Sequence, residues 1–383
     1  MFQRTFENRA WIPLTGTFPG SADRLEARVV VREGYDGSDT DWTPLLRDPD
    51  GVGISGGLWV DGGGWYQLEV RVLSGGAISE QTRVEHFGVG EVFVMAGQSN
   101  SANSGSVLLI PQDDRVTRPS KLTEPAGEWV LAADPQPFAN GGGGSPWPPM
   151  GDRLADAFKV PIGMISVGVG TTTVSQWQPT TTLYPRLREA LTFLGPNGLR
   201  AILWHQGESD TLAGTSSALY ATLLQNVIHA SRNDAGWEVP WAVALVGFHP
   251  DGTSENEAEI VAGQRLAIAG DPLVFEGPNT DELGAAWRSD TVHFNEAGLR
   301  EHGRRWVDTI RSLQEQLDLR FSSVRVEAGR LLLTWPADER VRLQKTSQLT
   351  LPDWQEIPVD PGAVGSTQTL QDPQAFYRLW IQP

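Results

Sequence analysis

The feature that most constrains this chain is the apolar run at residues 91–100, which ends abruptly in glycine, amide and hydroxyl side chains. A run rich in valine and phenylalanine that stops at Gly97 predicts a buried strand of a parallel sheet. Ligands bind at the carboxyl ends of the strands in open α/β sheets. The run therefore places Ser99 at a binding edge, where a serine serves either as a helix N-cap or as a nucleophile.

Composition limits the possible partners. The net charge is -17, from 47 acidic and 30 basic residues with no basic block, which argues against nucleic acid and anionic membranes. Because no apolar run reaches about 18 residues, we expect no membrane insertion. Cysteine is absent, which excludes disulfides, thiolate catalysis and cysteine-based zinc sites. Most of the 15 tryptophans are expected in the core, and a minority could line a sugar-binding cleft.

The hydrophobic patterns divide the 383 residues into three predicted domains. Residues 1–88 alternate like strands, for example at 25–31 and 65–73, and predict a small antiparallel β-sandwich. Residues 89–318 alternate apolar runs with amphipathic stretches, which predicts a mostly parallel sheet with helices on both faces. Residues 319–383 predict a small β domain. In the central domain the expected strands are 92–95, 162–167, 201–204, 241–246 and 273–275, and the expected helices are 151–159, 184–194, 216–231, 255–269 and one capped by Asn295.

Four stretches with polar or ionisable residues lie at the ends of predicted strands, and we expect them to converge at one edge of the sheet: 97–100, 168–173, 204–210 and 290–293. Acyl transfer by a serine needs a base, an acid that orients the base, and donors for the oxyanion. Asp290 and His293 are spaced so that the carboxylate can reach Nδ1 while Nε2 faces Ser99. The alternative is a surface aspartate beside a capping histidine.

Three groups are the predicted oxyanion donors: the backbone N–H groups of Ser99 and Gly170, and the side-chain amide of Gln206. The alternative interpretation of Gly168 and Gly170 is an ordinary turn. Several residues beside the predicted site are candidates for substrate binding, with loop packing as the alternative: Gln98, Asn100, Glu208, Trp177, Gln176 and Asn103.

A metal site is a competing interpretation, because His205, Glu208 and Asp210 are residue types that bind metals. Zinc catalysis usually needs closely placed histidines, and the chain has neither His-x-His nor His-Glu-x-x-His. We therefore expect no metal, and we expect these residues to orient Gln206, fix the loop or contact substrate.

The four polar stretches described above, together with the order in which they follow one another over residues 89–318, resemble the sialate O-acetylesterase and acetylxylan esterase branch of the SGNH (GDSL-like) hydrolases. The resemblance implies a flavodoxin-like three-layer α/β domain, here flanked by two small all-β domains. It implies Ser99 as nucleophile, His293 as base and Asp290 as its partner, with Gln206 where many SGNH enzymes use asparagine, and no cofactor. Members often carry a glycine pair at the position of Gly170-Thr171, so Thr171 is the alternative backbone donor.

The expected function is a carbohydrate O-acetylesterase that acts on an acetylated polysaccharide or glycan, with the acetylxylan type favoured. The β domains, the acidic composition and the expected secretion favour a polysaccharide over a sialoside. The alternatives are a sialate O-acetylesterase and, from another class, a non-catalytic carbohydrate-binding protein on an SGNH scaffold. The complete set of Ser99, Asp290 and His293 favours the enzyme. The C-terminal segment loosely resembles accessory β domains of secreted bacterial polysaccharide enzymes, so we expect a secreted or periplasmic protein, although the first residues do not resemble a signal peptide. The sequence indicates no oligomeric state.

Overall fold

The computed structural model describes the chain except residues 49–50, 124–126, 319–322, 328–329, 336–340, 348–353, 361–362, 370–374 and 382–383. The chain divides into two compact units, Met1–Val307 and Asp308–Pro383. The predicted boundary after residue 318 adjoins residues that lie outside the described ones. No helix among the described residues has the length and apolarity needed to cross a membrane.

The N-terminal part of the first unit is antiparallel β-structure. The short strand β1 (Phe2–Gln3) pairs with β7 (Ala77–Gly97), and the other strands follow the order β7-β6-β3-β4-β5-β2. Strands β3 and β6 cover the predicted segments 25–31 and 65–73, and alternate residues such as Ala27 and Val29 are buried in one core. The remaining bounds are β2 (Arg9–Thr17), β3 (Arg24–Val31), β4 (Thr43–Arg47), β5 (Gly53–Asp61) and β6 (Trp65–Ser74).

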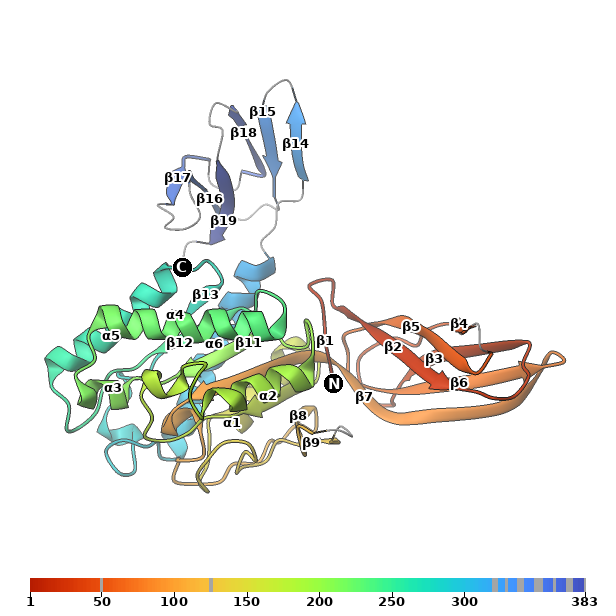
Figure 1. Cartoon of the computed structure of the whole chain (residues 1–383), viewed down its shortest axis with the longest axis horizontal. Coiled ribbons are helices and arrows are strands. Elements are labelled where there is room, and N and C mark those ends of the chain that lie inside the picture. The colour runs from red at the N-terminus through yellow and green to blue at the C-terminus, as the bar shows by residue number, and fades with distance from the viewer. Residues whose placement is uncertain are drawn as a thin grey trace. The chain divides into compact units, whose positions relative to one another are not determined.

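Strand β7 belongs to both parts of the first unit (Figure 1). Its first ten residues are exposed and pair antiparallel with β6, whereas residues 87–97 are buried. The buried half pairs in parallel with β10 (Ile162–Ser166) and β11 (Ala201–His205). The predicted boundary after residue 88 therefore falls within a continuous strand, and the three-domain division stays a prediction.

The central sheet is mostly parallel, as the alternating pattern predicted. Its main strands follow the order β10-β7-β11-β12-β13, where β12 is Trp241–Leu245 and β13 is Val274–Asn279. Strand β8 (Val116–Pro119) extends it in parallel, and β9 (Trp129–Leu131) closes that edge antiparallel. The five main strands thus have the order 2-1-3-4-5, in which the chain changes direction across the sheet beside the first strand. Ligands bind at such a switch point.

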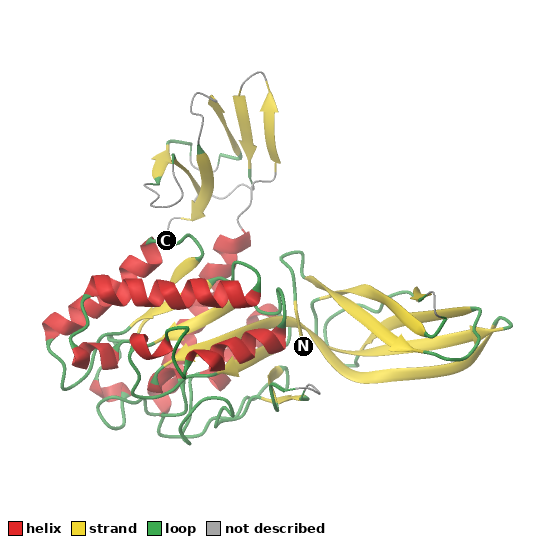
Figure 2. Cartoon of the chain, viewed as in Figure 1, coloured by secondary structure: helices red, strands yellow, loops and turns green. Residues whose placement is uncertain are grey.

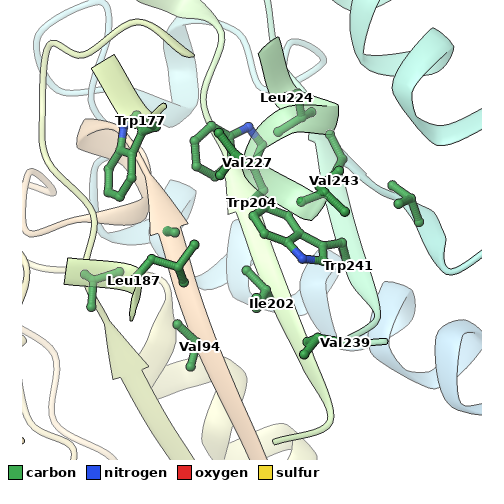
Figure 3. Packing of buried hydrophobic residues seen from close by; sticks show 14 of the residues in the cluster. Val94, Trp177, Leu187, Ile202, Trp204, Leu224, Val227, Val239, Trp241 and Val243 are labelled. Carbon is green, nitrogen blue, oxygen red and sulfur yellow. The ribbon is translucent and has the colours of Figure 1, made fainter. Parts of the chain in front are cut away.

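Helices cover this sheet (Figures 1 and 2). Helices α2, α4 and α5 pack on one face through aliphatic and tryptophan side chains, several of which are labelled in Figure 3. Helices α1 and α6 pack together through Trp147 and Trp306, whose ring centroids are 6.1 Å apart. As predicted, Asn295 caps α6, and its Oδ1 accepts from the N–H of Gly298 at 3.0 Å. The bounds are α1 (Trp147–Phe158), α2 (Tyr184–Leu194), α3 (Glu208–Ala213), α4 (Ser217–Ala235), α5 (Ser254–Ala269) and α6 (Glu296–Asp318).

The second unit contains strands on both sides of a small core, as the sequence predicted for this region. One antiparallel sheet has the order β14-β15-β18 and the other has the order β17-β16-β19. Leu333, Trp335, Val341 and Leu343 are buried in the core. The bounds are β14 (Ser323–Glu327), β15 (Arg330–Thr334), β16 (Val341–Thr346), β17 (Gln355–Ile357), β18 (Gly365–Thr369) and β19 (Phe376–Ile381).

A buried ion-pair network joins the N-terminal segment to the central sheet. The Glu91 carboxylate, fully buried on β7, pairs with Arg4 at 2.7 Å and with Arg200 at 2.8 Å, and it also accepts from Gln3 at 2.9 Å. Burial alone would raise the pKa of Glu91, but the positive charges of Arg200 and Arg4 outweigh it and lower this pKa. The carboxylate is therefore ionised at neutral pH.

We expect Glu91→Gln to destabilise the protein by about 3–5 kcal/mol, because the substitution leaves the buried Arg200 guanidinium without a counter-charge. Urea unfolding followed by tryptophan fluorescence would measure this loss. The matched control is Glu85→Gln, which breaks the exposed pair with Arg83 and should cost less than about 1 kcal/mol. Equal losses in the two variants would show that the buried network does not stabilise the fold.

Candidate active site

Ser99 lies directly beyond the carboxyl end of β7, in a 3-10 turn at Ser99–Ser101. The strand can end this way because Gly97 has φ +128°, and a Cβ there would lie 2.1 Å from the carbonyl oxygen of His205 on β11. The N–H of Gln98 then donates to that same oxygen at 2.9 Å. The turn is thereby fixed between the ends of β7 and β11, at the switch point, and Ser99 keeps 6% of its surface exposed.

Asp290 and His293 form a pair in the loop before α6. His293 Nδ1 lies 2.7 Å from Asp290 Oδ2, and Asp290 Oδ1 accepts from the backbone N–H groups of His293 and Val292. Burial alone would raise the pKa of Asp290, but the hydrogen bonds from His293 and from the backbone lower it. An ionised carboxylate only accepts, so Nδ1 carries the proton. Nε2 bonds to no described residue and has the lone pair that a base needs.

Asn100 joins the serine turn to the histidine loop. Its Nδ2 donates to the carbonyl oxygen of Val292 at 3.4 Å and to Oε1 of Glu208 at 3.0 Å. Asn100 follows Ser99 in the chain, Val292 precedes His293, and Glu208 begins α3. The structure therefore brings three of the four polar stretches together at one edge of the sheet.

Arg288, which the sequence did not single out, supports the histidine loop from inside the protein. Its guanidinium donates to the carbonyl groups of Leu283, Thr280 and Val292. It also lies over the ring of Phe294, at 4.7 Å. The sequence could not predict this role, because the acceptors are backbone carbonyl groups, which every loop contains and which leave no motif.

The fourth stretch also reaches Ser99. A Cβ on Gly170 would lie 3.4 Å from Ser99 Cβ, so these residues are neighbours. The N–H of Gly170, however, donates to Oδ1 of Asn140 at 2.8 Å, which makes it unavailable as the predicted oxyanion donor in this arrangement. The backbone N–H groups of Ser99 and Thr171 bond to no described residue. Thr171 has a left-handed backbone, φ +60°. Asn140 comes from a glycine-rich loop with no motif to reveal it.

The amide of Gln206 is committed to the protein. Gln206 is fully buried, and its Nε2 lies within hydrogen-bond distance of Asp210 Oδ2 at 2.7 Å, Thr172 O at 2.9 Å and Gln98 Oε1 at 3.2 Å. Its Oε1 accepts from the hydroxyl of Tyr220 at 3.1 Å. An amide has only two N–H groups, so none is left for the oxyanion role that the sequence predicted. Gln206 instead ties the ends of β7 and β11 to the loop at Thr172.

Several of the predicted substrate contacts lie inside the protein. Trp177 is fully buried, and its ring packs edge-on against Trp204 with centroids 5.5 Å apart (Figure 3). It belongs to the core and cannot stack on a sugar. Gln176 caps its own turn, and the Asn103 amide bonds to the loop at Gln136.

Glu208 and Gln98 are two further candidates for substrate contact. Glu208 is 1% exposed and its two oxygens accept from Asn100 and from the N–H of Gly207, so it orients protein groups. Gln98 remains a candidate for substrate contact. Its Oε1 accepts from Gln206 and from the N–H of Ser209, while its Nε2 donates to no described residue.

The residues considered as metal ligands each bond to protein groups. His205 Nε2 lies 2.8 Å from the hydroxyl of Thr280, and burial lowers the pKa of His205 to about 3, so the ring is neutral. Asp210 accepts from the N–H of Val174 and from the hydroxyl of Thr215. Among the residues that the structure describes, no group of three His, Asp or Glu side chains is placed to hold a metal ion.

A serine turn and an Asp–His pair at the carboxyl edge of a parallel sheet are typical of SGNH-type hydrolases. Residues 89–312, more than half of the chain, match the model of the family described as carbohydrate esterase, sialic acid-specific acetylesterase. The chain belongs to this family, and the resemblance seen in the four motifs is confirmed. It is a carbohydrate acetylesterase and therefore a carboxylic ester hydrolase. No curated protein matches the sequence.

The solved structures similar to this chain include the following three. A carbohydrate acetylesterase from Xanthomonas citri has 17% identity and a TM-score of 0.48, covering 98% of this chain and 90% of that one. A protein from Arabidopsis thaliana has 18% identity and a TM-score of 0.43, covering 57% and 96%. A family two carbohydrate esterase from Cellvibrio japonicus has 13% identity and a TM-score of 0.34, covering 81% and 89%.

The buried carboxyl group of Glu208 makes a testable contribution to pH-dependent stability. Burial raises its pKa from the ordinary 4.5 to about 7. A raised pKa favours the folded state below pH 4.5, and this contribution is lost as the pH rises through about 7. We expect Glu208→Gln, which cannot titrate, to gain stability relative to the native protein across this window, by on the order of 3 kcal/mol.

Unfolding midpoints measured between pH 4 and pH 8 would test this expectation. The control is Glu255→Gln, which removes an exposed carboxylate from the first turn of α5. Stability curves of the native protein and Glu208→Gln that stay parallel over the whole range would contradict the raised pKa.

Proposed function

We propose that this protein removes acetyl groups from a neutral acetylated polysaccharide of the acetylxylan type, with Ser99 as nucleophile, His293 as base and Asp290 as the residue that orients the base. One observation carries the proposal: Asn100, next to Ser99, donates to Val292, next to His293, in a loop whose Asp290 already binds Nδ1 of the imidazole. This contact supports the assignment of a nucleophile and a base that lie at the same edge of the sheet.

The proposed reaction has two halves. Ser99 Oγ attacks the acetyl carbonyl while Nε2 of His293 takes the hydroxyl proton, and the same proton then passes to the departing sugar oxygen. Water, deprotonated by His293, then attacks the acetyl-serine, the ester bond to Ser99 Oγ breaks as His293 returns the proton to Oγ, and acetate leaves. For the oxyanion we propose the N–H groups of Ser99 and Thr171, because the donors of Gly170 and Gln206 are already bonded. No cofactor enters either half.

The charges around the site support a neutral glycan over a sialoside. Within residues 97–100, 204–210 and 288–295, the acidic and basic side chains other than histidine are those of Glu208, Asp210, Asp290 and Arg288. The guanidinium of Arg288 bonds to backbone carbonyls, so it offers no obvious partner for the carboxylate of a sialic acid. An acidic site in a chain of net charge -17 disfavours an anionic substrate.

The proposal also includes the domain architecture. A central flavodoxin-like three-layer SGNH domain over residues 89–318, flanked by small β domains, is supported by the 2-1-3-4-5 strand order and by helices on both faces of the sheet. A secreted or periplasmic location would bring such an enzyme to a polymeric substrate outside the cytoplasm.

Acetate release over a panel of acetylated xylan, mannan, pectin and sialosides tests the substrate class. We expect the neutral acetylated xylan and mannan to be hydrolysed with higher kcat/KM than the anionic pectin and sialosides. Ser99→Ala should lower kcat by roughly 10⁴-fold or more without changing the unfolding midpoint, and the exposed Ser254→Ala is the control. A preference for sialosides, or undiminished turnover by Ser99→Ala, would refute the proposal.

The role of Asp290 can be separated from that of an ordinary surface aspartate. Asp290→Asn should lower kcat by at least about 10²-fold, because an amide does not hold the Nδ1-protonated tautomer as an ionised carboxylate does. Asp251→Asn is the matched control, since Asp251 lies 3.9 Å from a second histidine, His249, on the surface. Steady-state kinetics on an acetyl ester would measure both. Similar small losses in both variants would remove Asp290 from the mechanism.

A further inference from the structure

A concave site lies far from Ser99, at the amino edge of the central sheet. It has a volume of about 620 Å³ and lies where β1, β2 and the end of α2 come together (Figure 1). We call it the aromatic groove and define it by Thr5, Trp11, Trp59, Trp129, Phe193 and Asn197, all of which line it. Beside it, β1 pairs with Val89 at the start of the buried half of β7. Ser99 follows the other end of that strand, roughly 25 Å away.

The aromatic rings of the groove come in two pairs. Trp11 and Trp59 face each other across β2 and β5, with ring centroids 5.7 Å apart and planes at 61°. Trp129 and Phe193 form the second pair, with centroids 6.2 Å apart. Trp11 is 47% exposed and Trp59 is 48% exposed, although a packed β-structure normally buries rings of this size. Two half-exposed indoles on neighbouring strands provide a broad apolar surface to a ligand.

The groove also carries polar groups without partners. Thr5 Oγ1 is buried and forms no hydrogen bond. The exposed amide of Asn197, and the indole N–H groups of Trp11 and Trp59, bond to no other residue that the structure describes. A mostly apolar concavity with a few free hydrogen-bonding groups is the usual chemistry of a ligand site.

Charge identifies the class of ligand. None of the fourteen residues that line the groove has an acidic, basic or histidine side chain, in a protein with 77 charged residues. The guanidinium of Arg9 stacks over the Trp59 ring, 4.6 Å from its centroid, but Arg9 does not line the groove, so the lining side chains offer no counter-charge to an ionic ligand. A second copy of a chain with net charge -17 would be repelled. Sugar rings have apolar C–H faces that stack on indoles and hydroxyl groups that bond to amides and hydroxyls. A neutral polyhydroxylated chain therefore matches this lining.

We propose that the aromatic groove is a second binding site, for a neutral polysaccharide chain, which holds the polymer at a distance from the catalytic serine. Binding of unacetylated glycan is independent of the catalytic assignment. The effect on polymer hydrolysis rests on the proposed function. Two attachment points on one polymer raise the effective concentration of its acetyl groups at Ser99 without altering the chemistry.

Direct binding is the first test. Affinity electrophoresis with unacetylated xylan and calorimetry with xylohexaose would be run on the intact protein and on Trp11→Ala/Trp59→Ala. We expect at least a tenfold weaker affinity in the double variant. Trp42→Ala is the matched control, because Trp42 lies in the same β-structure under Arg28 and Arg71 and does not line the groove. Asn197→Ala, in an exposed loop, replaces the double variant if that one fails to fold, with a loss of about threefold or more.

Kinetics provide the second test. On acetylated xylan the groove variants should have at least a fivefold higher KM and an unchanged kcat, and on p-nitrophenyl acetate both parameters should be unchanged. If acetylated xylan proves not to be a substrate, the binding test still decides on the groove. Absence of binding to unacetylated xylan and xylohexaose, equal affinity in native and double-variant protein, or a native dimer that the double variant converts to monomer would each overturn the proposal.

Discussion

The structure of the first unit depends on the buried carboxylate of Glu91, because it fixes the strand that two sheets share. Before Glu91 the strand β7 is mostly exposed and antiparallel, and beyond it the strand is buried and parallel. The ion pairs with Arg4 and Arg200 connect the start of the chain, the middle of β7 and the residue just before β11. A buried ion pair is weak evidence for stability, but it strongly penalises any register that leaves one partner unpaired. The network therefore specifies where one sheet ends and the other begins.

Buried charged groups also fix the arrangement of the site at the other end of β7. Burial raises the pKa values of Glu208, Asp210 and Asp281 and lowers that of Arg288, so the fold places charges where they are costly. Glu208 holds Asn100 of the serine turn, and Arg288 holds Val292 of the histidine loop. Asp210 and Asp281 hold the neighbouring loops at Val174 and Gly247. The apolar cluster under α2, α4 and α5 provides the burial that offsets this cost. A site fixed by buried polar groups is rigid, which acyl transfer requires of its nucleophile and base.

The sequence predicted what depends on local spacing. Gly97 marked the end of β7, Asn295 marked the start of α6, and the separation of Asp290 and His293 was enough to predict their hydrogen bond. It could not predict which way a polar side chain points at the end of a strand, so Gln206 and Trp177 were expected to face the substrate and instead lie inside. Asn140 and Arg288 were missed because they act on single atoms of the backbone, and such contacts depend on tertiary structure rather than on motifs.

Strand β7 also sets the distance between the aromatic groove and Ser99, since the two lie at opposite ends of its buried half. A strand paired on both sides cannot bend or slide without breaking its ladders to β10 and β11, so this distance is fixed to within small fluctuations. A fixed span favours an extended polymer over a flexible or short one, because the effective concentration of the second contact is highest when the ligand matches the span. The length of β7 would then set the length of polymer that can contact both sites. This preference for length is independent of the chemistry at Ser99 that decides which ester is hydrolysed.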